Sequence, residues 1–498
     1  MAILASSLKP PKLLERGRRD AGLSGSAALV SSGAITGQFV LAAATPLITR
    51  LFDPDQLGVY AVLAAIIGMF ATVVGLHYEL AVPLPASQAR AVHVARLSLM
   101  AAGVMSVVVG TGLLAFGSNV LALSNASELA TLLWVVPICL LLTGLINTLT
   151  TWAIRVRAFS GTAASKALQG LGQAGAQISG GVVHAGVSGL VAGQFGGLIF
   201  GVAPLLRAAR PVFALKKYAW STTWLIAVAR KYRRFPLITT WSSLVNALGA
   251  NLPVVMFSSL FGGYVAGQFA LSFRLLQMPL RLVGQSVSQV FFSHAASAVR
   301  DRSLPSLAEG VYRGMVAFGL PSFVIGAAIA PQFFEVIFGR DWVDGGRYTQ
   351  VLMPWMFFSF ISNAFSVLVS VLGRQGSELG FQVLIVVVVS VSLLLGAWYQ
   401  SAMIAASILG GLGGAALFAK VVWLLGIAGV PAKVHLRVLT TEGAIAIVLG
   451  AVVWWASSVL KDPIVVTVTG VAALLLVHGV NLWGRDVYVM RSRSPSRL

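Results

Sequence analysis

Long apolar segments follow one another along almost the whole chain, separated by short stretches that carry charge, glycine or proline. Each is about 20 residues long or slightly longer, which is the length an α-helix needs to cross a bilayer. We predict fourteen spans, at residues 25–50, 58–78, 95–116, 129–151, 163–183, 187–206, 237–259, 265–291, 311–331, 348–372, 379–398, 401–424, 441–459 and 464–484. The span at 163–183 is the weakest because it is rich in Gly and Gln, and counts of twelve or thirteen remain open.

One apolar stretch, residues 268–292, carries a stripe of polar side chains. They recur at steps of three or four: Arg274, Gln277, Arg281, Gln285 and Ser288. At 3.6 residues per turn, this spacing places them on one face of a helix. An arginine within a span costs about 2.5–3.5 kcal/mol on insertion scales and normally faces a bundle interior or a wet cavity. We therefore predict a polar cavity that receives an anion. The alternative is an arginine that reaches the headgroup layer or is paired structurally.

The composition agrees with a membrane protein that has many spans. The chain has 498 residues, of which 57% are hydrophobic and 10% charged, and its mean hydropathy is +0.87. Soluble domains carry about 25% charged residues. The predicted fold class is therefore an all-α integral membrane protein. A single cysteine, Cys139, leaves no intrachain disulfide, and the scattered histidines show no ligand spacing, so we predict no metal and no cofactor.

The positive charge is distributed as expected for a membrane orientation. The formal net charge is +20, which by itself is also compatible with nucleic-acid binding. With a cytoplasmic N-terminus, and with residues near a span end counted with the adjoining side, 29 of the 35 Lys and Arg residues fall on the predicted cytoplasmic side, four fall outside and two lie well within a span. This asymmetry is the positive-inside pattern. It predicts that both termini are cytoplasmic, and it favours an even number of spans and no nucleic-acid partner.

The basic stretch between the sixth and seventh spans divides the chain into two halves. A weak Pro–Phe–Gly pattern recurs at the first loop of each half: Pro46, Phe52 and Gly58, then Pro253, Phe261 and Gly267. Six spans separate the two copies, so the pattern predicts a parallel repeat. The predicted organisation is a basic N-terminus at 1–24, an N-lobe at 25–206, a cytoplasmic linker at 207–236, a C-lobe at 237–425, two further spans within 426–485, and a cytoplasmic tail at 486–498.

Several other predicted spans carry a polar face. Examples are Asn147 in the fourth span, Asn246 in the seventh, Ser366 in the tenth, and the series Gln169, Gln173 and Gln177 in the fifth. Such faces can line a cavity, or they can allow close helix packing and interhelical hydrogen bonds. Both interpretations stay open at this point.

Three stretches resemble a known group of proteins. They are PLITRLFDP followed by LGVY (residues 46–60), HYELAVPLP (77–85), and FGRDW followed by GRY (338–348). In order and spacing, the chain resembles bacterial oligosaccharide flippases of the multidrug/oligosaccharidyl-lipid/polysaccharide exporter superfamily. The second motif usually begins with Arg where this chain has His77.

The resemblance implies two six-helix lobes in a V-shaped arrangement, followed by two C-terminal helices, and transport by alternating access. The implied substrate is an undecaprenyl-pyrophosphate-linked oligosaccharide, moved to the outer leaflet of the bacterial cytoplasmic membrane for O-antigen, capsule or exopolysaccharide synthesis. Membrane lipids, a polysaccharide polymerase and export machinery are the implied partners, and no enzymatic activity is implied.

The polar stripe and the resemblance together give the candidate residues. Arg274 and Arg281 would contact the diphosphate, because guanidinium pairs well with phosphate oxygens. The predicted secondary lining comprises Gln277, Gln285, Asn246, Asn147 and Ser366. Residues with a possible role in coupling or gating are Glu79, Arg50 and His77.

Two alternatives remain. A cation-coupled drug exporter of the same superfamily would usually need a buried carboxylate, whereas the acids here lie at span ends or in loops. A membrane glycosyltransferase or polymerase would normally show an acidic pair or a large external loop, and the longest predicted external loop, about 331–347, is short.

Overall fold

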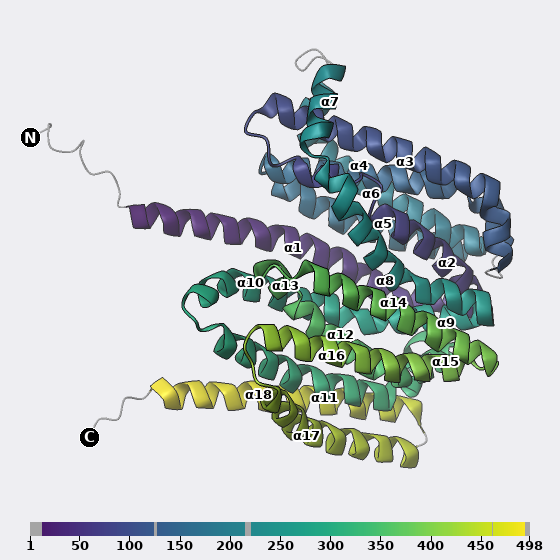
Figure 1. The fold of residues 1–498 in the computed structure, drawn as a ribbon. Helices are drawn as coiled ribbons and strands as arrows, with labels where there is room; N and C mark the ends of the chain where they lie inside the picture. The colour runs from purple at the N-terminus through teal and green to yellow at the C-terminus, as the bar shows by residue number, and fades with distance from the viewer. Residues whose placement is uncertain (1–11, 124–126, 215–220, 461, 494–498) are drawn as a thin grey trace, which may run out of the picture. The chain divides into compact units, whose positions relative to one another are not determined.

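The computed structural model describes residues 12–123, 127–214, 221–460 and 462–493, and these residues form helices and short connections without a strand (Figure 1). The helices up to residue 231 are α1 (Lys12–Leu51), α2 (Pro54–Ala71), α3 (Gln88–Leu123), α4 (Val135–Arg155), α5 (Phe159–Val182), α6 (Val187–Phe213) and α7 (Thr222–Lys231). The later helices are α8 (Thr240–Phe261), α9 (Gly263–Pro279), α10 (Gln285–Arg300), α11 (Leu304–Phe338), α12 (Val343–Phe365), α13 (Val367–Val371), α14 (Gln375–Trp398), α15 (Ala402–Ile408), α16 (Gly414–Ile427), α17 (Ala432–Val459) and α18 (Pro463–Arg493).

Eleven helical segments among the described residues are long and apolar enough to cross a membrane, so the chain is a multi-pass membrane protein of the predicted all-α class. The predicted count of fourteen is not confirmed. Three predicted spans, 163–183, 265–291 and 464–484, fall on helices outside these eleven. The first is rich in Gly and Gln, the second changes pitch after 17 residues of α9, and the third has a shorter apolar part, Pro463–Gly479.

The second predicted span, 58–78, is too long at its C-terminal end. Helix α2 ends at Ala71, and the chain continues through turns into a short 3₁₀ helix at Tyr78–Ala81. Leu76 and His77 adopt the left-handed conformation, with φ of 49° and 58°. Two successive residues in this conformation cannot continue a right-handed helix, so the regular span stops before them.

The contacts divide the chain into two compact units. The first unit comprises Met1–Ile48, Phe70–Ala115 and Leu132–Ser243. The second comprises Thr49–Met69, Phe116–Thr131 and Leu244–Leu498. The predicted boundaries of the lobes, the linker and the tails stay predictions.

In the first unit, α5 and α6 are joined by a seam of glutamine and glycine. Each glutamine of α5 faces a glycine of α6 in antiparallel register: Gln169 with Gly201, Gln173 with Gly197, and Gln177 with Gly193. A Cβ at Gly197 would lie 2.8 Å from the Gln169 carbonyl oxygen, closer than Cβ atoms approach neighbouring atoms. Small residues at four-residue spacing allow two membrane helices to approach this closely. We call these six residues the glutamine–glycine seam.

The second unit has an aromatic core. Phe257 of α8 stacks on Phe269 of α9 with ring centroids 4.0 Å apart. Phe269 in turn stacks on Phe273 at 5.5 Å, and Phe273 stacks on Trp355 of α12 at 5.5 Å. Such ring pairs contribute about 0.5–1.5 kcal/mol each beyond the burial of their area. The row fixes α8, α9 and α12 together and ends at a cavity.

Candidate functional site

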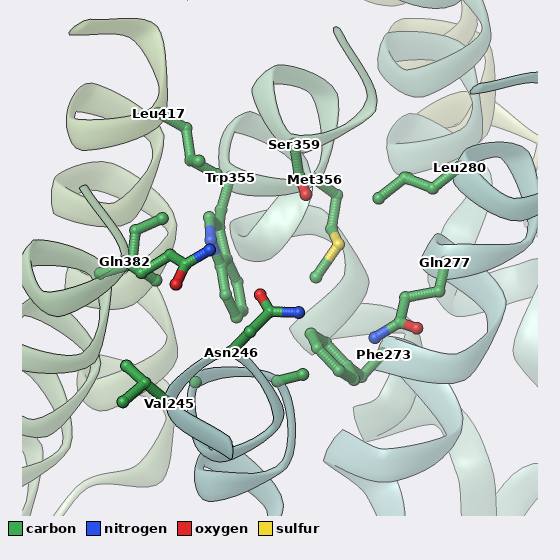
Figure 2. Close-up of a pocket in the computed structure, with 13 residues that line it drawn as sticks. Val245, Asn246, Phe273, Gln277, Leu280, Trp355, Met356, Ser359, Gln382 and Leu417 are labelled. Carbon is green, nitrogen blue, oxygen red and sulfur yellow. The ribbon is translucent and has the colours of Figure 1, made fainter. Parts of the chain in front are cut away.

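The cavity of the second unit has a volume of about 180 Å³ and lies among α8, α9, α12, α14 and α16 (Figure 2). Its lining residues are Val245, Asn246, Gly249, Ala250, Phe273, Gln277, Leu280, Trp355, Met356, Ser359, Gln382, Ile385 and Leu417. Figure 2 shows the amide groups of Asn246, Gln277 and Gln382 on three different helices, with the indole of Trp355 among them. The polar groups therefore converge from elements far apart in the sequence.

Three amides and a hydroxyl supply the polar surface of this cavity. Asn246, Gln277 and Gln382 each carry a donor and an acceptor, and Ser359 adds a hydroxyl. The Gln382 Oε1 atom is buried and has no hydrogen-bond partner among the described residues. A buried acceptor without a partner is unusual, and here it lies beside an open volume where a ligand hydroxyl can donate to it.

The remaining wall is apolar and partly aromatic, with Phe273, Trp355 and Met356 as its largest side chains. A sugar ring presents hydroxyls at its edge and C–H groups on its faces. Amides that both donate and accept suit the hydroxyls, and flat aromatic rings suit the faces. None of the lining residues carries a charge, so the cavity suits a neutral polar ligand better than an isolated ion.

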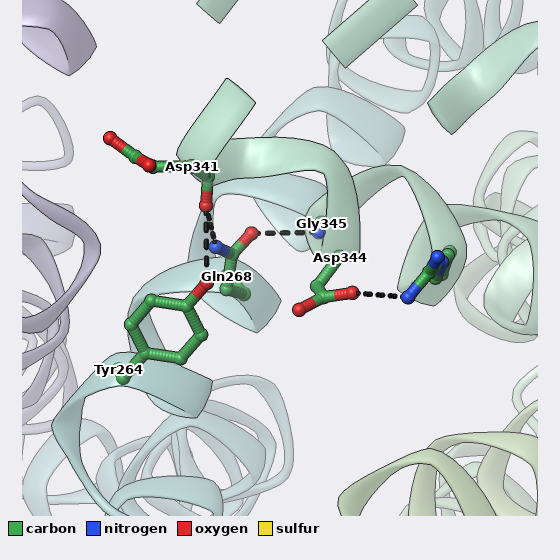
Figure 3. Close-up of polar contacts among 6 residues, drawn as sticks. Tyr264, Gln268, Asp341, Asp344 and Gly345 are labelled. Atoms are coloured by element: carbon green, nitrogen blue, oxygen red, sulfur yellow. Dashed lines mark hydrogen bonds and ion pairs between the residues drawn. The ribbon is translucent and has the colours of Figure 1, made fainter. Parts of the chain in front are cut away.

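Helix α9, which supplies Phe273 and Gln277, is fixed at its N-terminal half by buried Gln268 and Ser272. The Gln268 Nε2 atom donates to the Asp341 carbonyl, and its Oε1 accepts from the Gly345 amide at 2.7 Å (Figure 3). The Ser272 hydroxyl donates to the Gly345 carbonyl at 2.5 Å. These bonds tie α9 to the start of α12, which carries Trp355 further along.

The C-terminal end of α9 is less regular. Between Leu280 and Gly284 the helix widens to a π-type turn, in which the Gln285 N–H donates to the Leu280 carbonyl. Such a turn takes more residues than an α-helical turn. The spacing assumed for residues 268–292 therefore holds at Arg274 and Gln277 and is interrupted before Gln285.

Two predicted lining residues, Asn246 and Gln277, come together in the cavity. Arg274 lies half-buried three residues before Gln277 on α9, outside the lining. Gln285 is exposed at the start of α10. Arg281 lies in the wide turn, and its side chain is outside the part that the structure describes. The diphosphate role of the two arginines and the lining role of Gln285 stay predictions.

Asn147 and Ser366 do not line this cavity. Asn147 is half-buried on α4 of the first unit. Ser366 lies between α12 and α13, where its hydroxyl donates to the Asn363 carbonyl at 2.7 Å. Their predicted roles are likewise not tested by this geometry.

The three candidates for coupling or gating differ in burial. Glu79 and His77 are buried in the segment after α2. Burial raises the pKa of the Glu79 carboxyl, an effect opposed by hydrogen bonds from its own backbone and from Ser98. Burial lowers the pKa of His77. Arg50 is exposed and donates to the Val336 carbonyl at 3.4 Å within the second unit.

The sequence analysis missed Trp355, Gln382 and Lys420 as candidate residues. Trp355 occurs in a stretch rich in aromatic residues, where nothing distinguishes it from core. Gln382 was detectable as an amide in a Val-rich span, four residues after Glu378. Lys420 entered the sequence analysis only as one of the positive charges counted for the topology, and in the structure it is buried in α16 and paired with Glu378.

A second volume in this unit, about 300 Å³, is almost entirely apolar. Its residues come from α9, α11, α12 and α18: Leu275, Leu276, Pro279, Ser322, Phe323, Gly326, Ala327, Ile329, Ala330, Phe333, Phe334, Thr349, Met353, Val471 and Leu474. Leu276 and Gln277 are neighbours on α9, so one helix borders both volumes. We call this second volume the apolar groove.

Comparison with solved structures defines the class of this fold. The chain superposes on the lipid II flippase MurJ in an inward closed conformation with a TM-score of 0.69 and 12% identity, covering 93% of this chain and 99% of that one. It also superposes on a multidrug resistance MATE family transporter of the MOP superfamily, in an inward-facing conformation, with a TM-score of 0.60 and 15% identity, covering 80% of this chain and 98% of that one. The fold is therefore that of MOP-superfamily transporters.

The family follows from the sequence. The model of the polysaccharide biosynthesis protein family matches residues 47–345, more than half of the chain, and the chain belongs to this family. No curated protein matches the chain significantly in sequence. The chain therefore combines membership in a polysaccharide biosynthesis family with a fold that a flippase and a MATE family transporter share.

Proposed function

We propose that this protein is a flippase that moves undecaprenyl-pyrophosphate-linked oligosaccharide units from the inner to the outer leaflet of the bacterial cytoplasmic membrane by alternating access. The units serve surface polysaccharide synthesis, and both termini are cytoplasmic. The observation that carries the proposal is the cavity in which Asn246, Gln277 and Gln382 converge beside Trp355. Membership in a polysaccharide biosynthesis family supports a saccharide as the cargo.

Each part of the substrate has a matching surface. The cavity amides bind sugar hydroxyls, and Phe273 and Trp355 cover the faces of a ring. Arg274 and Arg281 contact the diphosphate, because guanidinium and phosphate form charge-assisted, often bidentate hydrogen bonds. The apolar groove accommodates part of the prenyl chain, because its wall offers hydrocarbon contact.

The remaining candidates have secondary roles in this proposal. Gln285, Asn147 and Ser366 extend the polar lining, whereas Glu79, His77 and Arg50 act in coupling or gating. The partners are membrane lipids and, at the outer leaflet, a polysaccharide polymerase and the export machinery.

The test is a flipping assay with the full-length protein in vesicles that contain a fluorescent undecaprenyl-pyrophosphate-linked oligosaccharide. An added quencher reports which leaflet holds the sugar. Replacing both Asn246 and Gln382 with leucine removes two hydrogen-bonding amides, and each such bond contributes about 0.5–1.5 kcal/mol. We expect flipping to slow about tenfold or more, whereas Gln289→Leu, the same change at an exposed site on α10, leaves the rate near wild type.

Wild-type vesicles that move no lipid-linked sugar would contradict the flippase proposal. If the same vesicles instead exported a cationic dye under an ion gradient, the drug-exporter alternative would replace it. Normal flipping by the Asn246→Leu/Gln382→Leu variant would show that the cavity does not bind the cargo.

A further inference from the structure

An ion pair is buried in the second unit between α14 and α16. The Lys420 Nζ atom lies 2.5 Å from Glu378 Oε1, and the two side chains are 8% and 18% exposed. Both helices lie within candidate membrane spans. Ionisable groups inside a membrane protein are expensive to bury, and they mark functional sites by default.

The pair lies next to the cavity. Gln382 follows Glu378 by four residues on α14, and Leu417 precedes Lys420 by three on α16. Both Gln382 and Leu417 line the cavity, and residues three or four apart share a helix face. The ion pair therefore occupies the next turn of the same two helices. An aromatic contact between these helices, Phe381 with Trp423 at 5.1 Å, lies close to the pair in sequence.

The pair is incompletely satisfied. The Glu378 Oε2 atom is buried and has no hydrogen-bond partner among the described residues, and the same is true of Gln382 Oε1 one turn along α14. The attraction within a buried ion pair offsets the cost of desolvating the two charges only when the remaining polar atoms are also hydrogen-bonded. This pair therefore contributes little to the stability of the fold, and its position beside an open cavity needs another explanation.

We propose that Lys420 is a further cation for the phosphate end of the ligand whose sugar occupies the cavity, in addition to the two arginines, and that Glu378 holds the ammonium while the site is empty. This inference rests on the proposed function, because it assigns the cavity a ligand that is both glycosidic and phosphorylated. Lysine binds phosphate as a point charge on a flexible four-carbon stem. One helical turn, about 5.4 Å, is within the reach of that stem.

The carboxylate and the phosphate compete for one cation in this arrangement. In the empty site the Lys420 ammonium and the Glu378 carboxylate neutralise each other. When an anion arrives, the ammonium turns to it and Glu378 loses its partner. Glu378 therefore opposes binding, whereas Lys420 favours it. If the pair is purely structural, substitution of either residue changes the ligand affinity in the same direction. The directions of the two changes therefore distinguish a structural pair from a binding site.

The experiment measures equilibrium binding of farnesyl pyrophosphate, a short prenyl pyrophosphate, to the full-length protein in detergent. Lys420→Gln is expected to weaken binding about tenfold or more, and Glu378→Gln to tighten it several-fold. Arg374→Gln serves as the matched control, because it removes an exposed cation one turn before Glu378, and it is expected to change the affinity less than twofold. The Lys420→Gln/Glu378→Gln double variant carries no buried charge at this position and is expected to bind as weakly as Lys420→Gln alone.

Effects of the same sign from Lys420→Gln and Glu378→Gln, or no effect from either, would overturn the assignment. If a single variant does not fold, the double variant decides: wild-type affinity there rejects the site. Because this assay measures binding and not transport, a negative result does not by itself contradict the flippase proposal. If the two substitutions change the affinity in opposite directions but the protein flips no lipid-linked sugar, the phosphate site is retained and the proposed cargo is rejected. If the protein flips the sugar but both substitutions change the affinity in the same direction, the cargo is retained and the phosphate site is rejected.

Discussion

Two sets of amide side chains, alike in the sequence, have opposite environments in the structure. In α5, Gln169, Gln173 and Gln177 follow one another at four-residue steps and pack against α6. In the second unit, the amides of Asn246, Gln277 and Gln382 point into an open volume. Each set places amide groups on otherwise apolar helices, and the second set lines a cavity.

The facing residues explain the difference. Opposite the α5 glutamines stand Gly193, Gly197 and Gly201, which let the two backbones approach closely and leave Gln177 only 1% exposed. There the Gln177 Nε2 atom donates to the Leu190 carbonyl at 3.3 Å. Around the cavity, by contrast, the largest side chains are Phe273, Trp355 and Met356. Such side chains hold helices apart, so the size of the facing residues decides whether a polar face packs or lines a cavity.

The largest effect on this contrast is expected when a glycine of the seam is replaced by a larger residue. Gly197→Leu places a side chain where a Cβ alone would lie 2.8 Å from the Gln169 carbonyl oxygen and 2.9 Å from Gln173 Cβ. Overpacking of a close contact costs about 1–3 kcal/mol and occasionally more, and here backbone is involved. We expect most of the folded protein to be lost, measured as monodisperse yield in detergent and as Tm.

The control for this substitution is Gly175→Leu on α5, where nothing lies within 4 Å of the added Cβ. The same side chain there is expected to leave yield and Tm close to wild type. Equal losses at both positions would indicate that glycine matters for the helix itself and not for the seam.

A matched pair of substitutions separates packing from binding. Gln177→Met removes the hydrogen bond to Leu190 at a position that is 1% exposed, so we expect a loss of about 0.5–1.5 kcal/mol in stability with unchanged flipping by the folded fraction. Gln382→Met makes the same change in the cavity, where the Gln382 Oε1 atom has no hydrogen-bond partner among the described residues, and there we expect flipping to slow several-fold while Tm stays near wild type. Thermal melts and the flipping assay, run on both variants, read the two effects separately.

The opposite pattern, with a slower rate for Gln177→Met and a lower Tm for Gln382→Met, would reverse the roles assigned to the two sets. It would also move the search for a binding site from the second unit to the first.

The sequence predicts the fold class well, because the cost of exposing backbone polar groups in a bilayer allows little besides helices. The predicted helix ends and side-chain spacings are wrong where the backbone is irregular. The end of α2 depends on left-handed Leu76 and His77, and the wide turn at Leu280–Gly284 interrupts a spacing that looks regular in the sequence. Neither feature follows from periodicity, which assumes a constant helical pitch.

The site was predictable only in part, for a related reason. Polarity within a span identified Asn246 and Gln277, which do share the cavity. It identified Gln169 just as readily, although that side chain faces a glycine in the seam. Glycines at four-residue steps in α6, paired with glutamines at four-residue steps in α5, are a signal that could have separated the two cases. The pairing of Lys420 with Glu378 could not have been found, because it depends on which two helices are neighbours.

The smallest effect is expected at Glu79, where the first unit encloses a carboxyl group. Glu79 and Ser98 are buried in this unit, and the Ser98 hydroxyl is 2.8 Å from that of Thr148. Burial raises the pKa of Glu79 above its ordinary value of 4.5, so the folded protein holds this proton more tightly than the unfolded chain does. Stability is therefore greatest below the ordinary pKa and falls as the pH rises through the interval up to the raised pKa.

Glu79→Gln is expected to remove this part of the decline in Tm with pH, whereas Glu309→Gln, at an exposed pair with Arg313, retains it. Parallel Tm profiles for wild type and Glu79→Gln would show that the first unit is open to water at this point, and the contrast with the cavity of the second unit would then be weaker than the packing indicates.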